Sequence, residues 1–273
     1  MVSSMQEIYT TVRSVRNTDI PVTEIHCEGE AQALAVFVHG FKAERTEGGR
    51  FLKVARELAD HGFDSIMMDQ SGCGESSEPF DNYCLDNSLA DVECCIEHIL
   101  KPSVRRIVLV GYSMGGRVIS AYSKVGKHQV DTLVLWTPGI MEAEVMKMFL
   151  YDADGNSLYE EARKNGYGTY YNSFDNTYIH LSKEFYDGLF KYDTMEYVSL
   201  YQGNIMFVHG LVDDTVIPEV SIKAYNSLTT RKDKDLVLIW DANHGFGLWD
   251  NKPYQSDILT GKTVEFILKN SQK

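Results

Sequence analysis

Short runs of apolar residues without polar alternation recur along the chain, separated by segments whose apolar residues fall at helical spacing. Runs of the first kind are typical of strands covered on both faces, as in a parallel sheet. Apolar residues at helical spacing instead predict amphipathic helices. The predicted strands are 33–38, 64–69, a run starting at Ile107, 132–136, 204–210 and 236–240, and the predicted helices are 51–59, 87–100, 219–227, 254–268 and one after the Ile107 run.

This alternation of strand and helix predicts an α/β fold with a mostly parallel central sheet flanked by helices. Residues 6–27 alternate loosely and are broken at 17–19, which predicts an antiparallel hairpin at a sheet edge. In such folds reactive groups gather in the loops beyond the carboxyl ends of the strands. Catalytic residues are therefore expected in the loops that follow the predicted strands.

The pattern changes between residues 139 and 202, where methionine and aromatic residues accumulate without the spacing of a buried sheet. This stretch is predicted to be an inserted lid of short helices and a hairpin. The flanking parts, residues 1–138 and 203–273, are predicted to form one core domain, which suits a chain of 273 residues that is 44% hydrophobic.

A serine nucleophile is predicted where the Ile107 run ends. The run passes into Gly111-Tyr-Ser113-Met-Gly115 and then into a segment compatible with a helix. A sharp strand-to-helix turn exposes a serine hydroxyl to a base on one side and to backbone N–H groups on the other. Gly111 and Gly115 permit the close backbone approach of such a turn, because they have no Cβ.

A general base and an acid are predicted in later loops. His244 lies between the last predicted strand and the last helix and is the predicted base. The loop after the preceding strand offers two adjacent carboxylates, Asp213 and Asp214, to orient it. Counting from the strand end favours Asp213, whereas counting back from Pro218 favours Asp214. Asp213 is the predicted acid, and Asp214 is the alternative.

Attack of Ser113 on a carbonyl group creates an oxyanion that needs converging hydrogen-bond donors. The backbone N–H groups of Met114 and Phe41 are predicted to supply them, the second from the loop after the first buried strand. Gly40 allows that backbone to approach a substrate. His39 is predicted to be a structural hydrogen-bonding residue rather than a ligand-binding one.

Charge and composition disfavour several partners and cofactors. Lys and Arg number 26 against 39 Asp and Glu, a net charge of −13, so neither nucleic acid nor stable membrane association is expected. The five cysteines are predicted to be reduced, and the N-terminal residues do not resemble a signal peptide, so a cytoplasmic location is expected. No metal or cofactor is predicted: zinc motifs are missing from the sequence, and Gly72-x-Gly74 lacks the third glycine of a dinucleotide loop.

Five motifs follow one another along the chain. They are His39-Gly-Phe41, Asp69-Gln-Ser-Gly-Cys-Gly-Glu-Ser76, the 111–115 turn, the acid loop 209–218 and Asn243-His-Gly-Phe246. Together and in this order they resemble the motifs of α/β-hydrolase fold serine hydrolases. Within that superfamily the chain is most similar to small esterases and acylglycerol lipases with a short lid, including cinnamoyl and feruloyl esterases. The resemblance implies an α/β-hydrolase fold, a Ser-Asp-His triad and a lid that sets substrate choice. One departure is an extra residue between Asp213 and Pro218.

The predicted function is hydrolysis of a carboxylic ester through an acyl-enzyme on Ser113. The predicted partner is a small-molecule ester substrate. If the protein associates with itself, a homodimer is expected. Two alternatives use the same triad, an acyltransferase and an aminopeptidase, and a third is a ligand-binding protein on a hydrolase scaffold. An aminopeptidase needs a carboxylate cluster for a free amine, and the candidates for it are Glu142, Glu144, Glu160 and Glu161.

Overall fold

Strand β3, Ala33–Val38, shows how the apolar runs of the sequence form the interior of a sheet. All of its residues are buried, and successive side chains point to opposite faces. Val36 belongs to the hydrophobic cluster on one face of the sheet, and Phe37 belongs to the cluster on the other. A strand between two helix layers therefore needs an apolar run without polar alternation.

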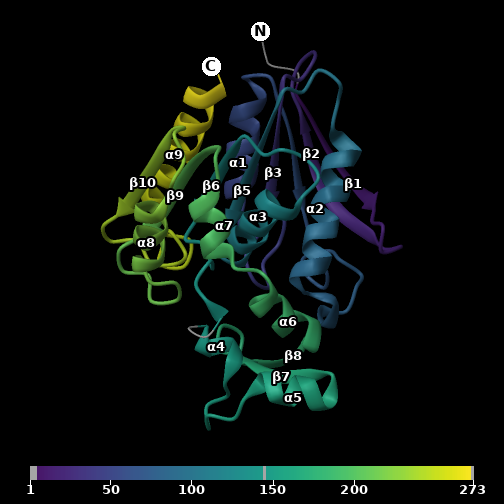
Figure 1. Ribbon diagram of the computed structural model, residues 1–273. Helices are drawn as coiled ribbons and strands as arrows, with labels where there is room; N and C mark the ends of the chain where they lie inside the picture. The colour runs from purple at the N-terminus through teal and green to yellow at the C-terminus, as the bar shows by residue number, and fades with distance from the viewer. Residues whose placement is uncertain (1–4, 144–145, 272–273) are drawn as a thin grey trace.

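The computed structural model describes residues 5–143 and 146–271. Besides β3, the strands of the central sheet are β1 (Gln6–Arg13), β2 (Asp19–His26), β4 (Phe63–Met68), β5 (Arg106–Tyr112), β6 (Thr132–Trp136), β9 (Asn204–Gly210) and β10 (Lys234–Ile239). Within the described residues their order is β1-β2-β4-β3-β5-β6-β9-β10 (Figure 1). The strands from β4 to β10 in this order are parallel, whereas β2 runs antiparallel to both of its neighbours.

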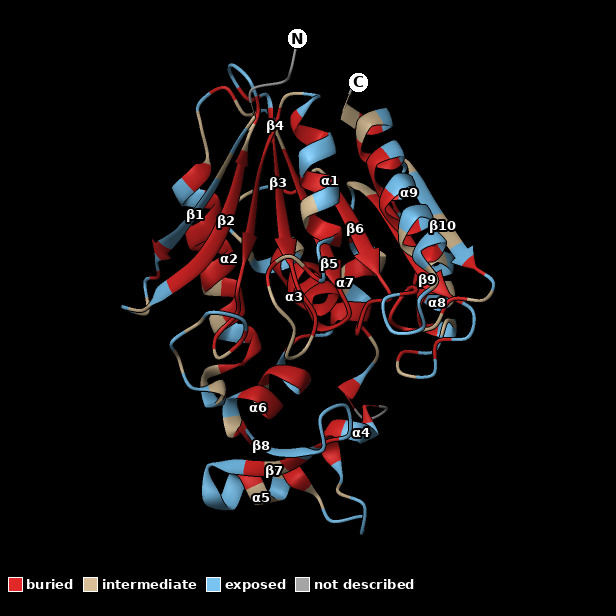
Figure 2. Ribbon diagram, turned by 180° about the vertical axis from the view of Figure 1, so that it is seen from behind, coloured by how far each residue is buried: buried red, intermediate tan, exposed pale blue. Residues whose placement is uncertain are grey.

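Helices cover both faces of this sheet. On one face lie α1 (Arg50–Ala59) and α9 (Pro253–Ser271), whose apolar residues join the cluster that contains Phe37. On the other face lie α2 (Leu85–Ile99), which follows the short 3-10 helix η1 (Phe80–Asn82), α3 (Met114–Val125) and α8 (Glu219–Ser227). Figure 2 shows the inner strands and the inner helix faces buried, whereas the outer helix faces and much of the edge strands β1 and β10 are exposed.

The segment between β6 and β9, residues 137–203, is called here the β6–β9 segment. Its described elements are α4 (Lys147–Leu150), α5 (Leu158–Asn165), the hairpin of β7 (Tyr167–Asn172) and β8 (Thr177–Ser182), α6 (Lys183–Lys191) and α7 (Thr194–Leu200). All of these except α7 gather beyond one end of the large sheet (Figure 1). In contrast, α7 packs beside α3, and Met195 and Val198 belong to the same cluster as Val36. The last helix of this segment therefore lies in a helix layer of the core.

The predicted fold class and the predicted order of strands and helices are confirmed. The hairpin predicted over residues 6–27 is the β1–β2 pair, and β1 is an edge strand. The last strand ends at Ile239 rather than at residue 240, because Trp240 leaves the sheet and is 77% exposed. Among the described helices, none is long and apolar enough to cross a membrane.

The sheet register brings the carboxyl ends of the central strands to one edge. Val38 at the end of β3 pairs with Gly111 in β5, and Gly111 pairs with Leu135 in β6. The loops that follow these strands therefore start side by side, on the side of the sheet where the β6–β9 segment lies (Figure 1).

Candidate active site

Ser113 occupies a tight turn between β5 and α3. Its backbone has φ 54° and ψ −117°, a conformation that a residue with a side chain rarely adopts. A Cβ added at Gly111 would lie 2.6 Å from the carbonyl oxygen of Gly115, and one added at Gly115 would lie 2.0 Å from that of Val38. Neither position has room for a side chain, so both glycines are needed for the turn.

Replacing Gly115 by alanine is expected to lower the free energy of unfolding by about 1–3 kcal/mol, because the new methyl group overlaps backbone atoms of β3. Gly261 in α9 is a matched control, since an added Cβ there meets no atom within 4 Å. Gly261→Ala should instead raise the free energy of unfolding by about 0.5–1 kcal/mol. Urea unfolding of both variants tests this, and a Gly115→Ala protein as stable as the wild type would contradict it.

Ser113, His244 and Asp213 form a continuous chain of hydrogen bonds. His244 Nε2 lies 3.1 Å from Ser113 Oγ, and His244 Nδ1 lies 2.7 Å from Asp213 Oδ2. All three residues are buried, whereas Asp214 is exposed to solvent. This is the arrangement in which a carboxylate orients an imidazole that removes the proton of a serine.

The carboxylate of Asp213 is held from several directions. Its Oδ1 accepts hydrogen bonds from the backbone N–H groups of Thr215 and Val216, each at 2.9 Å. Its Oδ2 accepts one from Thr137 Oγ1 at 2.5 Å. Burial acts to raise the pKa of Asp213, but hydrogen bonds with His209, His244 and Thr137 bring it below its usual value. Asp213 is therefore ionised at neutral pH and accepts the Nδ1 proton of His244.

His209, at the end of β9, supports the same carboxylate from behind. Its side chain is fully buried, with Nε2 at 2.7 Å from the carbonyl oxygen of Val216 and Nδ1 at 2.7 Å from Ser221 Oγ. A carbonyl oxygen only accepts, so Nε2 of His209 carries a proton, and this contact holds the loop that carries Asp213. Neither His209 nor Thr137 was predicted to belong to the site, and their sequence signal is that both are polar residues at carboxyl ends of strands.

The two predicted oxyanion donors lie on segments next to Ser113. A Cβ added at Gly40 would lie 3.4 Å from Ser113 Cβ, so the loop that carries Phe41 packs directly against the nucleophile. Within the described residues, the backbone N–H of Phe41 donates no backbone hydrogen bond. Met114 is the first residue of α3, where an N–H has no acceptor in its own helix. Both N–H groups are therefore free to bind an oxyanion.

His39 joins the ends of β3 and β4. Its Nε2 accepts a hydrogen bond from the backbone N–H of Gln70 at 3.0 Å, and its Nδ1 lies 2.7 Å from the carbonyl oxygen of Gly40. Complete burial lowers the pKa of His39, so the ring is neutral. The predicted structural role of His39 is confirmed by these contacts.

The tip of the β7–β8 hairpin contacts two loops of the candidate site, the one that carries Phe41 (the predicted oxyanion loop) and the one that carries His244 (the histidine loop). Lys42, next to Phe41, pairs with Asp175 at the tip at 2.5 Å. The neighbouring Phe174 contacts Trp249 with ring centroids 5.1 Å apart, and Trp249 lies 6.0 Å from the ring of His244. The hairpin therefore bridges the oxyanion loop and the histidine loop.

An aromatic cluster surrounds the side chain of Phe41. Its ring contacts aromatic rings at or next to η1 and in the β6–β9 segment, at centroid distances from 5.0 to 6.2 Å. Met114, which directly follows Ser113, belongs to the same hydrophobic cluster. The rings in contact are those of Phe80, Tyr83, Phe149, Tyr170 and Phe185.

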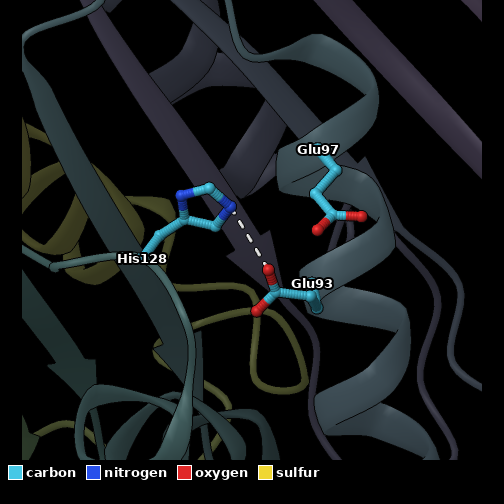
Figure 3. Close-up of side chains that lie close together, drawn as sticks. All are labelled: Glu93, Glu97 and His128. Carbon is cyan, nitrogen blue, oxygen red and sulfur yellow. Dashed lines mark ion pairs between the residues drawn. The ribbon is translucent and has the colours of Figure 1, made fainter.

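One group among the described residues has donors close enough together for a metal ion, and it lies outside these loops. Glu93 and Glu97 on α2 and His128 after α3 have ligand atoms within 4.8 Å of one another (Figure 3). His128 Nε2 lies 3.2 Å from Glu93, and Lys127 Nζ lies 3.0 Å from Glu97. The Lys127 ammonium group lies 3.8 Å from Glu93 as well, so a cation of the protein already pairs with both carboxylates and ties α2 to the end of α3.

The glutamates considered for binding an amine do not share one site. Glu142 pairs with Lys223 on α8, and Glu160 pairs with Arg163 on its own helix. Glu161 accepts hydrogen bonds from the backbone N–H and hydroxyl of Thr169. The fourth candidate, Glu144, lies outside the described residues. The three described carboxylates are thus each engaged in a separate contact. 

Comparison with known protein families identifies the family to which this fold belongs. A family model described as alpha/beta hydrolase fold matches residues 36–178, just over half of the chain. A protein of Synechocystis sp. provisionally named a non-heme chloroperoxidase is 34% identical over 104 residues, which are 38% of this chain and 36% of that protein. A proline iminopeptidase of Saccharolobus solfataricus is 33% identical over 69 residues, which are 24% of this chain and 22% of that protein. The chain thus covers about a third or less of the length of these curated relatives.

Solved structures resemble this one over nearly its whole length. Est1E from Butyrivibrio proteoclasticus, in a structure with bound ferulic acid, superposes with a TM-score of 0.78. The match covers 97% of this chain and 100% of that chain at 18% sequence identity. A likeness at this identity establishes the common fold and leaves the chemistry to be argued from the site.

Proposed function

The chain belongs to the alpha/beta hydrolase fold family, and we propose that within it the protein is a serine hydrolase that cleaves carboxylic esters. The observation that carries this proposal is the Ser113–His244–Asp213 chain of hydrogen bonds, with distances of 3.1 and 2.7 Å. It is supported by the backbone N–H groups of Phe41 and Met114, which donate no backbone hydrogen bond within the described part of the chain. Together these supply the nucleophile, base, acid and oxyanion donors that acyl transfer requires.

The first half of the proposed reaction forms an acyl-enzyme. His244 Nε2 accepts the hydroxyl proton of Ser113 as Oγ attacks the ester carbonyl carbon, and Asp213 stabilises the resulting imidazolium. The carbonyl oxygen becomes an oxyanion that accepts hydrogen bonds from the N–H groups of Phe41 and Met114. The tetrahedral intermediate then collapses, the ester bond breaks, and the alcohol leaves with the proton from His244.

The second half regenerates the free enzyme. A water molecule gives one proton to His244 as its oxygen attacks the acyl carbon, and the same two N–H groups stabilise the second oxyanion. Collapse of this intermediate releases the carboxylic acid and returns the proton from His244 to Ser113. The cycle consumes only ester and water, so these residues complete it without a cofactor.

We further propose that the part of the β6–β9 segment from α4 to α6 acts as a lid over the acyl site, whereas α7 belongs to the core. The hairpin contacts to Lys42 and Trp249 and the aromatic cluster around Phe41 support this role. A small-molecule ester with an apolar acyl group suits such a cluster. An aminopeptidase is less favoured, because the described glutamates 142, 160 and 161 do not converge on one amine-binding site.

A panel of substrates tests the proposal directly. Purified protein is assayed with p-nitrophenyl esters from acetate to palmitate, with methyl ferulate and with an aminoacyl amide, each before and after treatment with a fluorophosphonate probe. We expect ester turnover with an optimum in acyl length that disappears as the probe labels Ser113. Labelling with turnover of the amide alone would support a peptidase, and labelling with no turnover of any substrate would favour an acyltransferase. Absence of both would overturn the hydrolase proposal.

A further inference from the structure

A buried ion pair, Glu47 with Arg50, lies behind the catalytic loops and takes no part in the reaction steps above. Glu47 Oε1 lies 3.3 Å from Arg50 Nη2, and both side chains are about 5–6% exposed. Arg50 is the first residue of α1, and Glu47 lies in the turn that leads into it. Both side chains also form hydrogen bonds to other parts of the protein.

Each member of the pair binds the backbone next to a catalytic residue. Glu47 Oε2 accepts a hydrogen bond at 3.0 Å from the backbone N–H of Gly40, which directly precedes Phe41. Arg50 Nη1 donates one at 2.8 Å to the carbonyl oxygen of Gly245, which directly follows His244. The pair therefore connects the loop of the proposed oxyanion donor to the loop of the proposed base.

Tyr112 extends the same network to the nucleophile. It directly precedes Ser113, and its hydroxyl donates a hydrogen bond at 2.7 Å to the carbonyl oxygen of His244. The guanidinium of Arg50 lies 5.0 Å from the centre of the Tyr112 ring. Contacts of Glu47, Arg50 and Tyr112 thus reach the backbone beside all three loops that would act on the substrate.

Two features of Glu47 are energetically unfavourable, the burial of its carboxylate and its backbone conformation. Burial raises the pKa of Glu47 to about 7, even though Arg50 and the Gly40 N–H favour the ionised form. Glu47 also has a φ of 52°, a left-handed backbone that is unfavourable for a residue with a Cβ. An apolar pair of similar volume would avoid the cost of burying charge, so packing alone does not account for these residues.

We infer that Glu47 and Arg50 are positioning residues that hold the Phe41 N–H and His244 in register with Ser113. The inference rests on the proposed function, because it assigns these two residues to the same site. A displacement of a catalytic group by about 1 Å can lower a rate about 100-fold, so a loosened loop should slow the chemical step more than substrate binding.

Glu47→Gln and Arg50→Met test the inference, with Glu44→Gln as the matched control. Glu44 lies in the same loop, but its carboxylate accepts hydrogen bonds from Thr46 and Gly48 of that loop and, among the described residues, from no other group. We expect kcat for the best ester to fall about 10- to 100-fold in each test variant, with KM changed less than about threefold. The control should retain kcat within about twofold. Each rate is expressed per site titrated with the fluorophosphonate, so unfolded protein does not contribute.

A double variant keeps the test valid if the single variants unfold. Glu47→Leu combined with Arg50→Met removes both charges, so no buried charge is left without its partner, and the fold should be retained. Its kcat should still be low, whereas a purely structural pair predicts that kcat per titrated site recovers. Wild-type kcat in Glu47→Gln, or in the double variant, would overturn the inference and leave the proposed function intact. A wild-type protein that neither turns over esters nor reacts with the probe would overturn both.

Discussion

Replacing Ser113 by alanine is expected to lower kcat for ester hydrolysis by about a millionfold, the order of loss found when the nucleophile of a serine hydrolase is removed. The hydroxyl of Ser113 lies 3.1 Å from His244 Nε2. Among the described residues no other hydroxyl is hydrogen-bonded to this nitrogen, so no other group can replace the nucleophile. The measurement is kcat on the best ester of the panel, together with fluorophosphonate labelling, which should be lost.

The fold of this variant should be unchanged, because only one partly satisfied hydroxyl is deleted. Ser123→Ala on α3 is a suitable control, since Ser123 Oγ donates only to the carbonyl oxygen of Ser120. That control should retain labelling and turnover within about twofold, as is usual for substitutions away from the site. Ester turnover by Ser113→Ala at the wild-type rate would refute the assignment of the nucleophile.

Replacing Asp213 by asparagine is expected to lower kcat by about 10⁴-fold, because an amide no longer selects the tautomer of His244 that accepts the serine proton. Asp214→Asn is the matched control in the next position and should change kcat less than about threefold, since Asp214 is exposed to solvent. Steady-state kinetics of both variants on one ester measure the difference. A large loss in Asp214→Asn with full activity in Asp213→Asn would show that the other carboxylate is the acid.

Most of the fold could be predicted because its signals are local. The apolar runs that form β3 and β6 coincide with the observed strands, Ala33–Val38 and Thr132–Trp136. The residues of such a run are enough to predict the strand, because a strand covered on both faces has no polar position. The ends of strands were less predictable. The apolar residue Trp240 was predicted to end the last strand, but β10 ends at Ile239, because the chain turns away from the sheet there and exposes Trp240.

In the candidate site, too, features formed by adjacent residues could be predicted, whereas contacts between distant residues could not. The turn at Ser113 could be recognised from adjacent residues, because its two glycines are required by backbone contact within the turn and with β3. The support of Asp213 by Thr137 joins residues 76 positions apart, and that of Gly245 by Arg50 joins residues 195 positions apart. No local pattern marks either contact, so neither could be predicted.

The sequence by itself determined the order of strands and helices, the turn at Ser113 and the order of serine, acid and histidine in loops at one edge of the sheet. Periodicity and glycine spacing express these features over a few residues at a time. Only the tertiary structure decided which of two adjacent aspartates faces His244, and that Glu47 and Arg50 connect two catalytic loops. These outcomes depend on how loops from distant parts of the chain meet, because a side chain's partner is set by packing across the sheet edge rather than by its neighbours in sequence.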